Sequence, residues 1–188
     1  NYLSGFPNRQ PFGLGTNYPD YVINPGHTLI GILAALHYRN KTGKGQHVEC
    51  AQLPSSVAPL APAIFDYTAN GRVQMRAGNW LPYAAPHNAF PCKPLSESPS
   101  PPDQRWIAIG CFSEGEWKAL VQAMGSPEWA AGAKFSTLEG RKANEGELES
   151  NLSAWTADKD AYELMHDLQS RGVPAGVVQS ARELLDVD

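Results

Sequence analysis

The placement of proline restricts the fold of this chain more than any other feature. Fourteen of the 16 prolines lie in residues 1–102, and only Pro127 and Pro174 lie beyond them. Proline interrupts helices and cannot donate a hydrogen bond to a sheet, so the front part cannot be uniformly helical. The back part is free to form helices. The sequence therefore predicts a change in structural character near the middle of the chain.

Length and composition limit the class of protein. The 188 residues, 42% of them hydrophobic, suffice for one compact body or two small ones. The longest apolar run, residues 29–36, is far shorter than the ~20 residues that cross a bilayer, so we expect no membrane span. No signal peptide is visible. The three cysteines form no CxxC pair, which predicts buried free thiols and a cytoplasmic location.

Charge is divided unevenly along the chain. Residues 1–112 carry eight Lys and Arg against five Asp and Glu, whereas residues 113–188 carry seven against fourteen. The slightly basic front part suits an anionic small molecule. The acidic back part argues against a nucleic-acid partner.

The front part contains signals for two helices and one strand. Residues 1–19 have no apolar period and are expected to form an ordered loop. Asn24 followed by Pro25 is typical of a helix N-cap, and the helix should end at Gly43 or Gly45. Residues 46–53 alternate as a strand does, and a second helix should run from about residue 59 or 62 to Asn70 and Gly71.

The back part reads as strands mixed with helices. HNAFPCK and RWIAIGC are expected to form two strands joined by a proline-rich loop over residues 95–104. Ser113 and Glu116 have capping-box spacing and precede a helical apolar period. Further helices are expected over residues 138–155 and 161–171, then a short VPAGVV strand and a helix that opens at Ser180. The charge-rich run 139–149 predicts a solvated helix face.

Asp20 is the candidate catalytic residue. It is a lone acid between a Gly/Pro loop and a helix start, where a carboxylate can serve as nucleophile toward an acyl group or as general base. An Asp at this place also simply complements the helix macrodipole, so position alone leaves both interpretations open. His27, His37 and His47 are ten residues apart, which is not a metal-ligand spacing, so no metal site is expected.

Several longer segments carry a family resemblance. YPDYVINPGHTLIGILAALHYRNKTGKGQHVECAQL, from Tyr18 to Leu53, closely resembles the family III CoA-transferases. Segments that agree further along the chain are ANGRV, RAGN, APHNAFPC, RWIAIG, FSTLEGR and RGVPAGVV. The resemblance covers nearly the whole chain.

The resemblance implies a function and a set of site residues. Asp20 matches the family aspartate that attacks an acyl-CoA thioester, which implies transfer of CoA between carboxylic acids through an aspartyl intermediate. CoA is then a substrate, and no permanently bound cofactor is expected. Candidate substrate-binding residues are Gly26, His27, Gly78, Asn79 and His87, although Gly78 and Asn79 also suit an ordinary turn and His87 an ordinary core or surface position.

Two alternatives to the transferase remain open. A racemase similar to alpha-methylacyl-CoA racemase would use the Asp20 carboxylate in acid/base chemistry at the alpha carbon. A catalytically silent, self-associating chain of the same fold is the other. Both keep the family fold and differ in chemistry.

The resemblance also implies an α+β organisation in parts. Residues 1–70 correspond to the end of a large domain, mainly helical with one strand, and residues 71–84 to a linker. Residues 85–180 correspond to a small α/β domain, and residues 181–188 to the start of a return helix. Family members form interlocked dimers, so we expect a homodimer or a partner chain that supplies the CoA-binding half.

Overall fold

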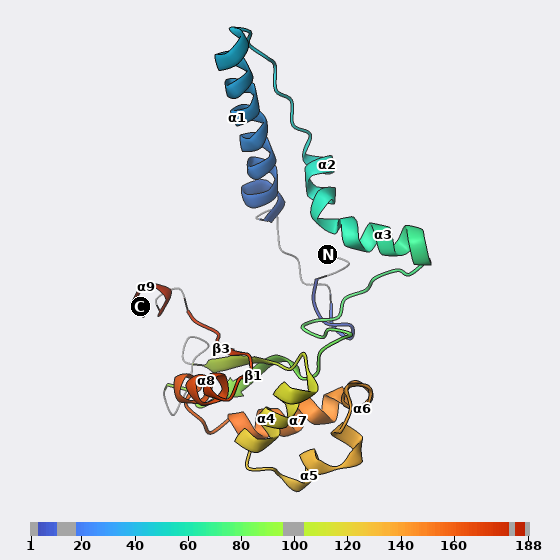
Figure 1. The fold of residues 1–188 in the computed structure, drawn as a ribbon, viewed down its shortest axis with the longest axis vertical. Coiled ribbons are helices and arrows are strands. Elements are labelled where there is room, and N and C mark those ends of the chain that lie inside the picture. The colour runs from blue at the N-terminus through green and yellow to red at the C-terminus, as the bar shows by residue number, and fades with distance from the viewer. Residues whose placement is uncertain (1–3, 11–17, 96–103, 181–182, 187–188) are drawn as a thin grey trace. The chain divides into compact units, whose positions relative to one another are not determined.

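A computed structural model describes residues 4–10, 18–95, 104–180 and 183–186 (Figure 1). Contacts group the chain into two units, Asn1–Gly78 and Asn79–Asp188. Each unit is considered by itself. The expected domain limits, 1–70 and 85–180, stay predictions.

The first unit is helical. A π-helical turn, η1 (Pro19–Ile23), runs directly into α1 (Asn24–Thr42). The expected N-cap at Asn24 is wrong, because Ile23 already has helical backbone angles and the helix therefore continues through it. Gly43 ends α1 as predicted, in the left-handed conformation with φ 72°, which glycine adopts at no steric cost.

The expected strand at residues 46–53 is also wrong. Residues 46–51 belong to no helix or strand, and α2 (Gln52–Val57) begins where the strand was expected to end. A strand needs a hydrogen-bonded neighbour, and the described part of the first unit contains none. A short 3-10 turn, η2 (Ala58–Leu60), then leads to α3 (Ala61–Asn70), which ends at Gly71 as predicted.

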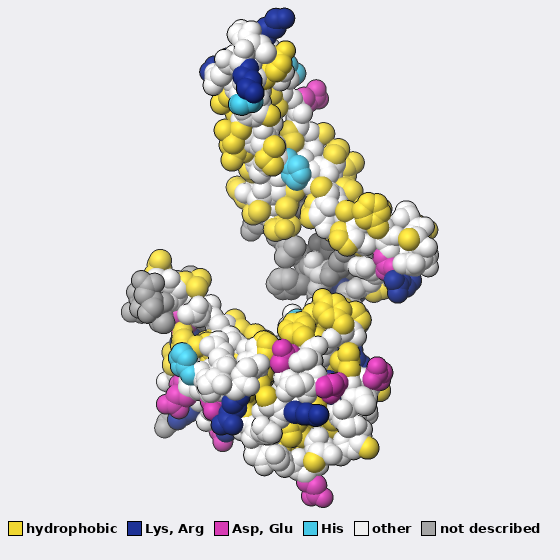
Figure 2. Space-filling model, in the orientation of Figure 1, with side chains coloured by type: hydrophobic (Ala, Val, Ile, Leu, Met, Phe, Trp, Pro, Cys, Tyr) yellow, Lys and Arg dark blue, Asp and Glu magenta, His cyan; other side chains and the backbone are white. Residues whose placement is uncertain are grey.

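The first unit has almost no buried interior. Among its described residues only Asn24 and Ser55 are buried, and both are polar. Large apolar side chains of α1 and α3 are exposed instead, as Figure 2 shows for the hydrophobic surface over these helices; examples are Leu29, Ile30, Leu33 and Phe65. Apolar surface on this scale is unusual on a soluble monomer.

The second unit is built on a three-stranded antiparallel sheet. Its strands are β1 (His87–Cys92), β2 (Arg105–Gly110) and β3 (Ala175–Val177), in the order β1-β2-β3. Ala89 pairs with Ala108, and Ala108 pairs with Gly176, so a row of small residues crosses all three strands. The two strands predicted around the proline-rich loop and the third from VPAGVV are confirmed. Residues 96–103 of that loop lie outside the described residues.

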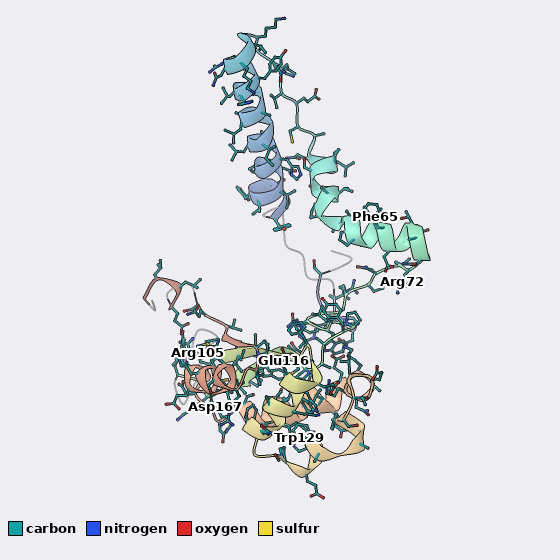
Figure 3. All side chains as sticks on the ribbon, in the orientation of Figure 1. Phe65, Arg72, Arg105, Glu116, Trp129 and Asp167 are labelled. Carbon is teal, nitrogen blue, oxygen red and sulfur yellow. The ribbon has the colours of Figure 1, made fainter. Side chains whose placement is uncertain are left out.

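Helices α4 (Glu114–Ala123), α7 (Glu145–Thr156) and α8 (Ala161–Ser170) contribute to one core with the sheet. This core includes Phe90, Ile107, Leu120, Leu152 and Leu168, each at most 1% exposed. The capping box at Ser113 and Glu116 is present, with both reciprocal hydrogen bonds; Figure 3 labels Glu116. Every buried hydrophobic residue of the described chain belongs to this unit.

The helix expected over residues 138–155 is interrupted. Asn144, with φ −121°, separates α6 (Leu138–Ala143) from α7. The charge-rich run here is not a uniformly solvated face, since Arg141 and Glu145 are buried and Glu149 is half-buried. That prediction is wrong because each of these charges has a polar partner: Arg141 pairs with Glu114, Glu145 pairs with Lys142, and Glu149 accepts from Trp80 and Asn88.

Smaller elements complete the second unit. They are α5 (Glu128–Ala131), the 3-10 turn η4 (Ala133–Phe135) and α9 (Glu183–Asp186). Residues 181–182 and 187–188 of the expected final helix lie outside the described residues, as do residues 1–3 and 11–17 of the expected first loop. The described helices and antiparallel sheet together make a mixed α+β fold, as predicted. None of these helices combines the length and apolar character needed to cross a bilayer.

Candidate active site

Asp20 lies in the π-helical turn that precedes α1, and its residue is exposed. A pocket of about 390 Å³ opens beside it. The lining combines polar and apolar residues: Asp20, Asn24, Thr28, Cys50 and Gln52 with Pro25, Leu29 and Ile32. An accessible carboxylate thus borders a space large enough for a small organic group. π-helical turns occur frequently at functional sites.

Cys50 borders the same pocket and is half-buried, so the expectation of a fully buried thiol is wrong for it. Its Sγ lies 3.4 Å from Ser55 Oγ. Hydrogen bonds from the side chains of Ser55 and, secondarily, Thr28 lower the pKa of the Cys50 thiol below its ordinary value. Nothing in the sequence alone distinguished this cysteine from the other two.

Asn24 is the buried polar residue of the pocket. It is 7% exposed, and neither its Nδ2 nor its Oδ1 has a hydrogen-bond partner among the described residues. A buried amide without a partner costs about 1–3 kcal/mol relative to a paired one. Such a group in a pocket wall is suited to a ligand that supplies the missing hydrogen bonds.

Gly26 and His27 lie in the first turn of α1 but outside the described lining of this pocket. His27 Nδ1 is 2.9 Å from the carbonyl oxygen of Ile23, and a Cβ added to Gly26 would meet no atom within 4 Å. Their predicted role in substrate binding is therefore not supported by a shared cavity. It stays a prediction.

Gly78 ends the first unit in a conformation that favours glycine, with φ 60°. Its N–H donates to the carbonyl of Gly5 over 2.8 Å, and an added Cβ would lie 2.5 Å from the ring of Phe6. The residue is thus fixed by packing within its own unit. A substrate contact of Gly78 stays a prediction.

Asn79 and His87 meet in the second unit. His87 Nδ1 is 2.5 Å from the carbonyl oxygen of Asn79, and because a carbonyl only accepts, Nδ1 carries the proton of this hydrogen bond. Phe112 packs edge-on against the imidazole, with ring centroids 5.6 Å apart. These three residues border a second pocket, about 460 Å³, whose floor is the row of small residues across the sheet.

A chain of hydrogen bonds connects two lining residues of this second pocket to Glu149 and Trp80. Asn79 Nδ2 donates to Asn88 Oδ1 over 2.8 Å, and Asn88 Nδ2 donates to Glu149 Oε1 over 2.9 Å. Trp80 Nε1 donates to the same Glu149 oxygen over 2.7 Å. Asn88 and Glu149 were absent from the sequence-based candidates, because Glu149 is 61 positions from Asn88 and no local pattern links them.

Metal-ligating side chains do not cluster in the described ranges. No three His, Cys, Asp or Glu side chains gather there as a metal ion would require. The polar groups that line the two pockets are a carboxylate, a thiol, a hydroxyl and two amides in the first unit, and an imidazole with two amides in the second.

Comparison with known proteins places these residues in a family. The profile of CoA-transferase family III matches residues 1–188. A succinyl-CoA–D-citramalate CoA-transferase of Chloroflexus aurantiacus is 33% identical over 97% of this chain and 43% of its own length. A succinyl-CoA:mesaconate CoA-transferase of Haloarcula marismortui is 32% identical over 84% of this chain and 36% of its own length.

A solved structure agrees with the sequence relatives. The crystal structure of a CAIB/BAIF family protein from Brucella suis aligns with a TM-score of 0.83 and 29% identity, covering 98% of this chain and 46% of that one. The chain spans less than half the length of these relatives. The profile match over the whole chain and the shared fold show that the protein belongs to CoA-transferase family III.

Proposed function

We propose that the protein takes part in transferring CoA from one carboxylic acid to another, with Asp20 as the nucleophile. The observation that supports this most is the exposed Asp20 carboxylate at the edge of a pocket of about 390 Å³. A carboxylate is a competent nucleophile toward a thioester when it is held close to the carbonyl carbon. The family assignment supplies the substrate class.

We propose that the acids between which CoA is transferred are dicarboxylic acids. Relatives carry the names of CoA-transferases for succinyl-CoA with citramalate, mesaconate or L-malate. These names share succinyl-CoA as donor and a short dicarboxylic acid as acceptor. We therefore propose succinyl-CoA as the donor and a second dicarboxylic acid as the acceptor.

The proposed chemistry proceeds by acyl transfer through Asp20. The carboxylate attacks the thioester carbonyl, the C–S bond breaks, and a mixed anhydride and CoA thiolate form. The thiolate then attacks the aspartyl carbonyl, which releases the first acid and leaves an aspartyl-CoA thioester. The acceptor carboxylate attacks that thioester, its C–S bond breaks, and a new mixed anhydride and CoA thiolate form. Attack of the thiolate on the acceptor's carbonyl then forms the new acyl-CoA and restores Asp20.

A second chain is part of this proposal. Large apolar side chains of α1 and α3, such as Leu29, Ile30 and Phe65, are exposed in the first unit. Two relatives are named as the alpha and beta subunits of a succinyl-CoA–L-malate CoA-transferase. We propose that a second copy of this chain or a partner subunit covers this apolar surface. The free thiols suit the proposed cytoplasmic location.

Trapping with hydroxylamine tests the nucleophile. The protein is incubated with succinyl-CoA and hydroxylamine, digested, and mapped by mass spectrometry. Asp20 should be converted to its hydroxamate, because both the anhydride and the aspartyl-CoA thioester react with hydroxylamine at the aspartyl carbonyl. Asp20→Asn should abolish the adduct. Glu49→Gln, which neutralises an exposed carboxylate of the same unit, should leave it unchanged.

The alternatives give different results. A racemase would wash solvent deuterium into the alpha position of an acyl-CoA without a hydroxamate at Asp20. Unchanged turnover of CoA transfer in Asp20→Asn would contradict the proposed role of this residue in either reaction.

A further inference from the structure

The Asp20 pocket contains a second nucleophile that the proposed mechanism does not use. Cys50 lines this pocket together with Asp20, and its Sγ is 3.4 Å from Ser55 Oγ. The Ser55 hydroxyl donates to the carbonyl of Ala51 over 3.0 Å, so it can accept from the thiol or rotate to donate to a thiolate. These contacts favour the thiolate, which is the reactive form.

The other two cysteines provide a contrast within the same chain. Cys92 and Cys111 are buried in the core of the second unit. Burial raises the pKa of Cys92 to about 11 and that of Cys111 to about 12. Neither is expected to react with an electrophile at neutral pH, so Cys50 is the candidate nucleophile among the three thiols.

Asn24 is the independent sign that this pocket takes a ligand. Its side chain is in the pocket wall, the residue is 7% exposed, and both polar atoms of the amide are unpaired among the described residues. A ligand carbonyl accepts from an amide N–H, and the same N–H stabilises the oxyanion that forms when that carbonyl is attacked. The pocket thus combines an unpaired donor with a thiol.

We propose that Cys50 is a modification site: the acyl-CoA substrate that enters the Asp20 pocket also transfers its acyl group to the Cys50 sulfur, with Asn24 supporting the thioester carbonyl. This inference rests on the proposed function for the identity of the thioester. It adds a second, slower acceptor beside Asp20.

The step is a thioester exchange and needs no further reactant. The Cys50 thiolate attacks the carbonyl carbon of acyl-CoA, an S–C bond forms at Cys50, and the bond from the carbonyl to the CoA sulfur breaks. CoA leaves as its thiolate and takes a proton from solvent. The bond that forms and the bond that breaks are of the same kind, so free CoA reverses the reaction. An acyl group on Cys50 would occupy pocket space beside Asp20 and slow CoA transfer until free CoA removes it.

Two thioester probes test the proposal. The protein is incubated in thiol-free buffer with succinyl-CoA and, in parallel, with the succinyl thioester of N-acetylcysteamine, which carries the reactive end without the nucleotide. Acidic digestion and mass spectrometry then locate succinyl groups. The succinyl group should appear on Cys50 and be absent from Cys92 and Cys111. The reference is a synthetic peptide of residues 46–55, which holds the same cysteine without the pocket.

With one or both probes, acylation of Cys50 should be at least about tenfold faster in the protein than in the peptide. Cys50→Ser should remove the adduct. Asn24→Ala should lower the rate about tenfold in a protein that keeps its circular dichroism spectrum, because it removes the unpaired amide donor. A rate equal to that of the peptide with both probes, or no adduct with either, would overturn the proposal. If Asn24→Ala does not fold, the comparison of the protein with the peptide decides the outcome by itself.

Hydroxylamine separates this proposal from the one on Asp20. It releases the acyl group from Cys50 as a free hydroxamate and leaves an unmodified thiol, whereas at Asp20 the hydroxamate stays on the chain. Asp20→Asn should lose the chain-bound hydroxamate and keep acylation of Cys50. Loss of one signal with retention of the other therefore shows which proposal fails.

Discussion

Arg141 and Glu114 form two parallel hydrogen bonds, with Nη1 to Oε2 at 2.9 Å and Nη2 to Oε1 at 2.8 Å. Arg141 is 1% exposed, and its Nε also donates to the carbonyl of Ala85. The guanidinium lies over the ring of Trp117 at 5.1 Å. One buried cation thereby joins α6 to the start of α4 and to the chain just before β1.

Removing the anionic partner should destabilise the second unit. In Glu114→Ala the buried guanidinium keeps its carbonyl partners but loses its charge partner, and we expect a loss of about 2–4 kcal/mol in the free energy of unfolding. Urea denaturation followed by tryptophan fluorescence measures it. Glu139→Ala, on the exposed side of α6, is the matched control and should change the free energy by less than about 0.5 kcal/mol. Equal losses in the two variants would contradict this role of the pair.

The same pair should make stability depend on pH. Hydrogen bonds from Arg141 lower the pKa of Glu114 in the folded protein below its ordinary value of about 4.3. The stabilisation is therefore complete above pH of about 4.3 and is lost as the pH falls through the lower folded-state pKa. In Glu114→Gln, thermal unfolding should show a deficit relative to the parent protein at pH 7, and this deficit should shrink below pH 4. A constant deficit would show that the charge is not involved.

Glu149 should contribute more to the stability of the second unit than an ordinary carboxylate on a helix surface. Glu149→Ala leaves the Trp80 indole N–H and the Asn88 amide without their acceptor, at an expected cost of about 2–3 kcal/mol. Glu149→Gln retains an acceptor oxygen and should cost less than about 1 kcal/mol. Chemical denaturation measures both, and a shifted Trp80 emission should accompany the alanine variant. Glu147→Ala removes only an exposed ion pair with Lys134 and is the control.

Gly78 should tolerate no side chain. Gly78→Ala combines a left-handed backbone with a contact to the Phe6 ring, whereas Gly71→Ala meets only the backbone strain, since no atom lies within 4 Å there. The second substitution should cost about 1 kcal/mol and the first measurably more. Limited proteolysis of the first unit compares the two. Replacing Phe6 with Ala in the Gly78→Ala protein should remove the difference, and persistence of the difference would exclude the ring contact as its cause.

The chain of 188 residues should self-associate. The expectation follows from the apolar side chains left exposed on α1 and α3. Light scattering after size-exclusion chromatography gives the mass. A monomer at every protein concentration measured would contradict the expectation.

Local chemistry made several helix starts and ends predictable in both units. The spacing of Ser113 and Glu116 specifies a capping box, and the apolar residues that follow at helical intervals need only the core to pack against. Gly43 and Gly71 end their helices because each adopts a positive φ that other residues avoid. These features depend on a few neighbouring residues, so a sequence pattern captures them.

The features that could not be predicted depend on contacts between residues far apart in the sequence. Residues 46–53 alternate as a strand does, but alternation does not provide the neighbouring strand that a sheet requires. Glu149 belongs to a run that reads as a solvated helix face, yet it accepts from Trp80, 69 positions earlier. Asp20 and Cys50 border one pocket because η1 and α1 contact α2, an arrangement that no local spacing encodes.

The division of burial between the units has a consequence for the order of folding. The second unit contains the hydrophobic core and three paired strands, so it can gain its structure cooperatively during or soon after synthesis. The first unit buries only Asn24 and Ser55 among its described residues, so most of its stability must come from whatever it packs against. Amide exchange in α1 should then be fast at low protein concentration and slow at high concentration. The Asp20 pocket should then form last, so the proposed CoA transfer should require completed assembly.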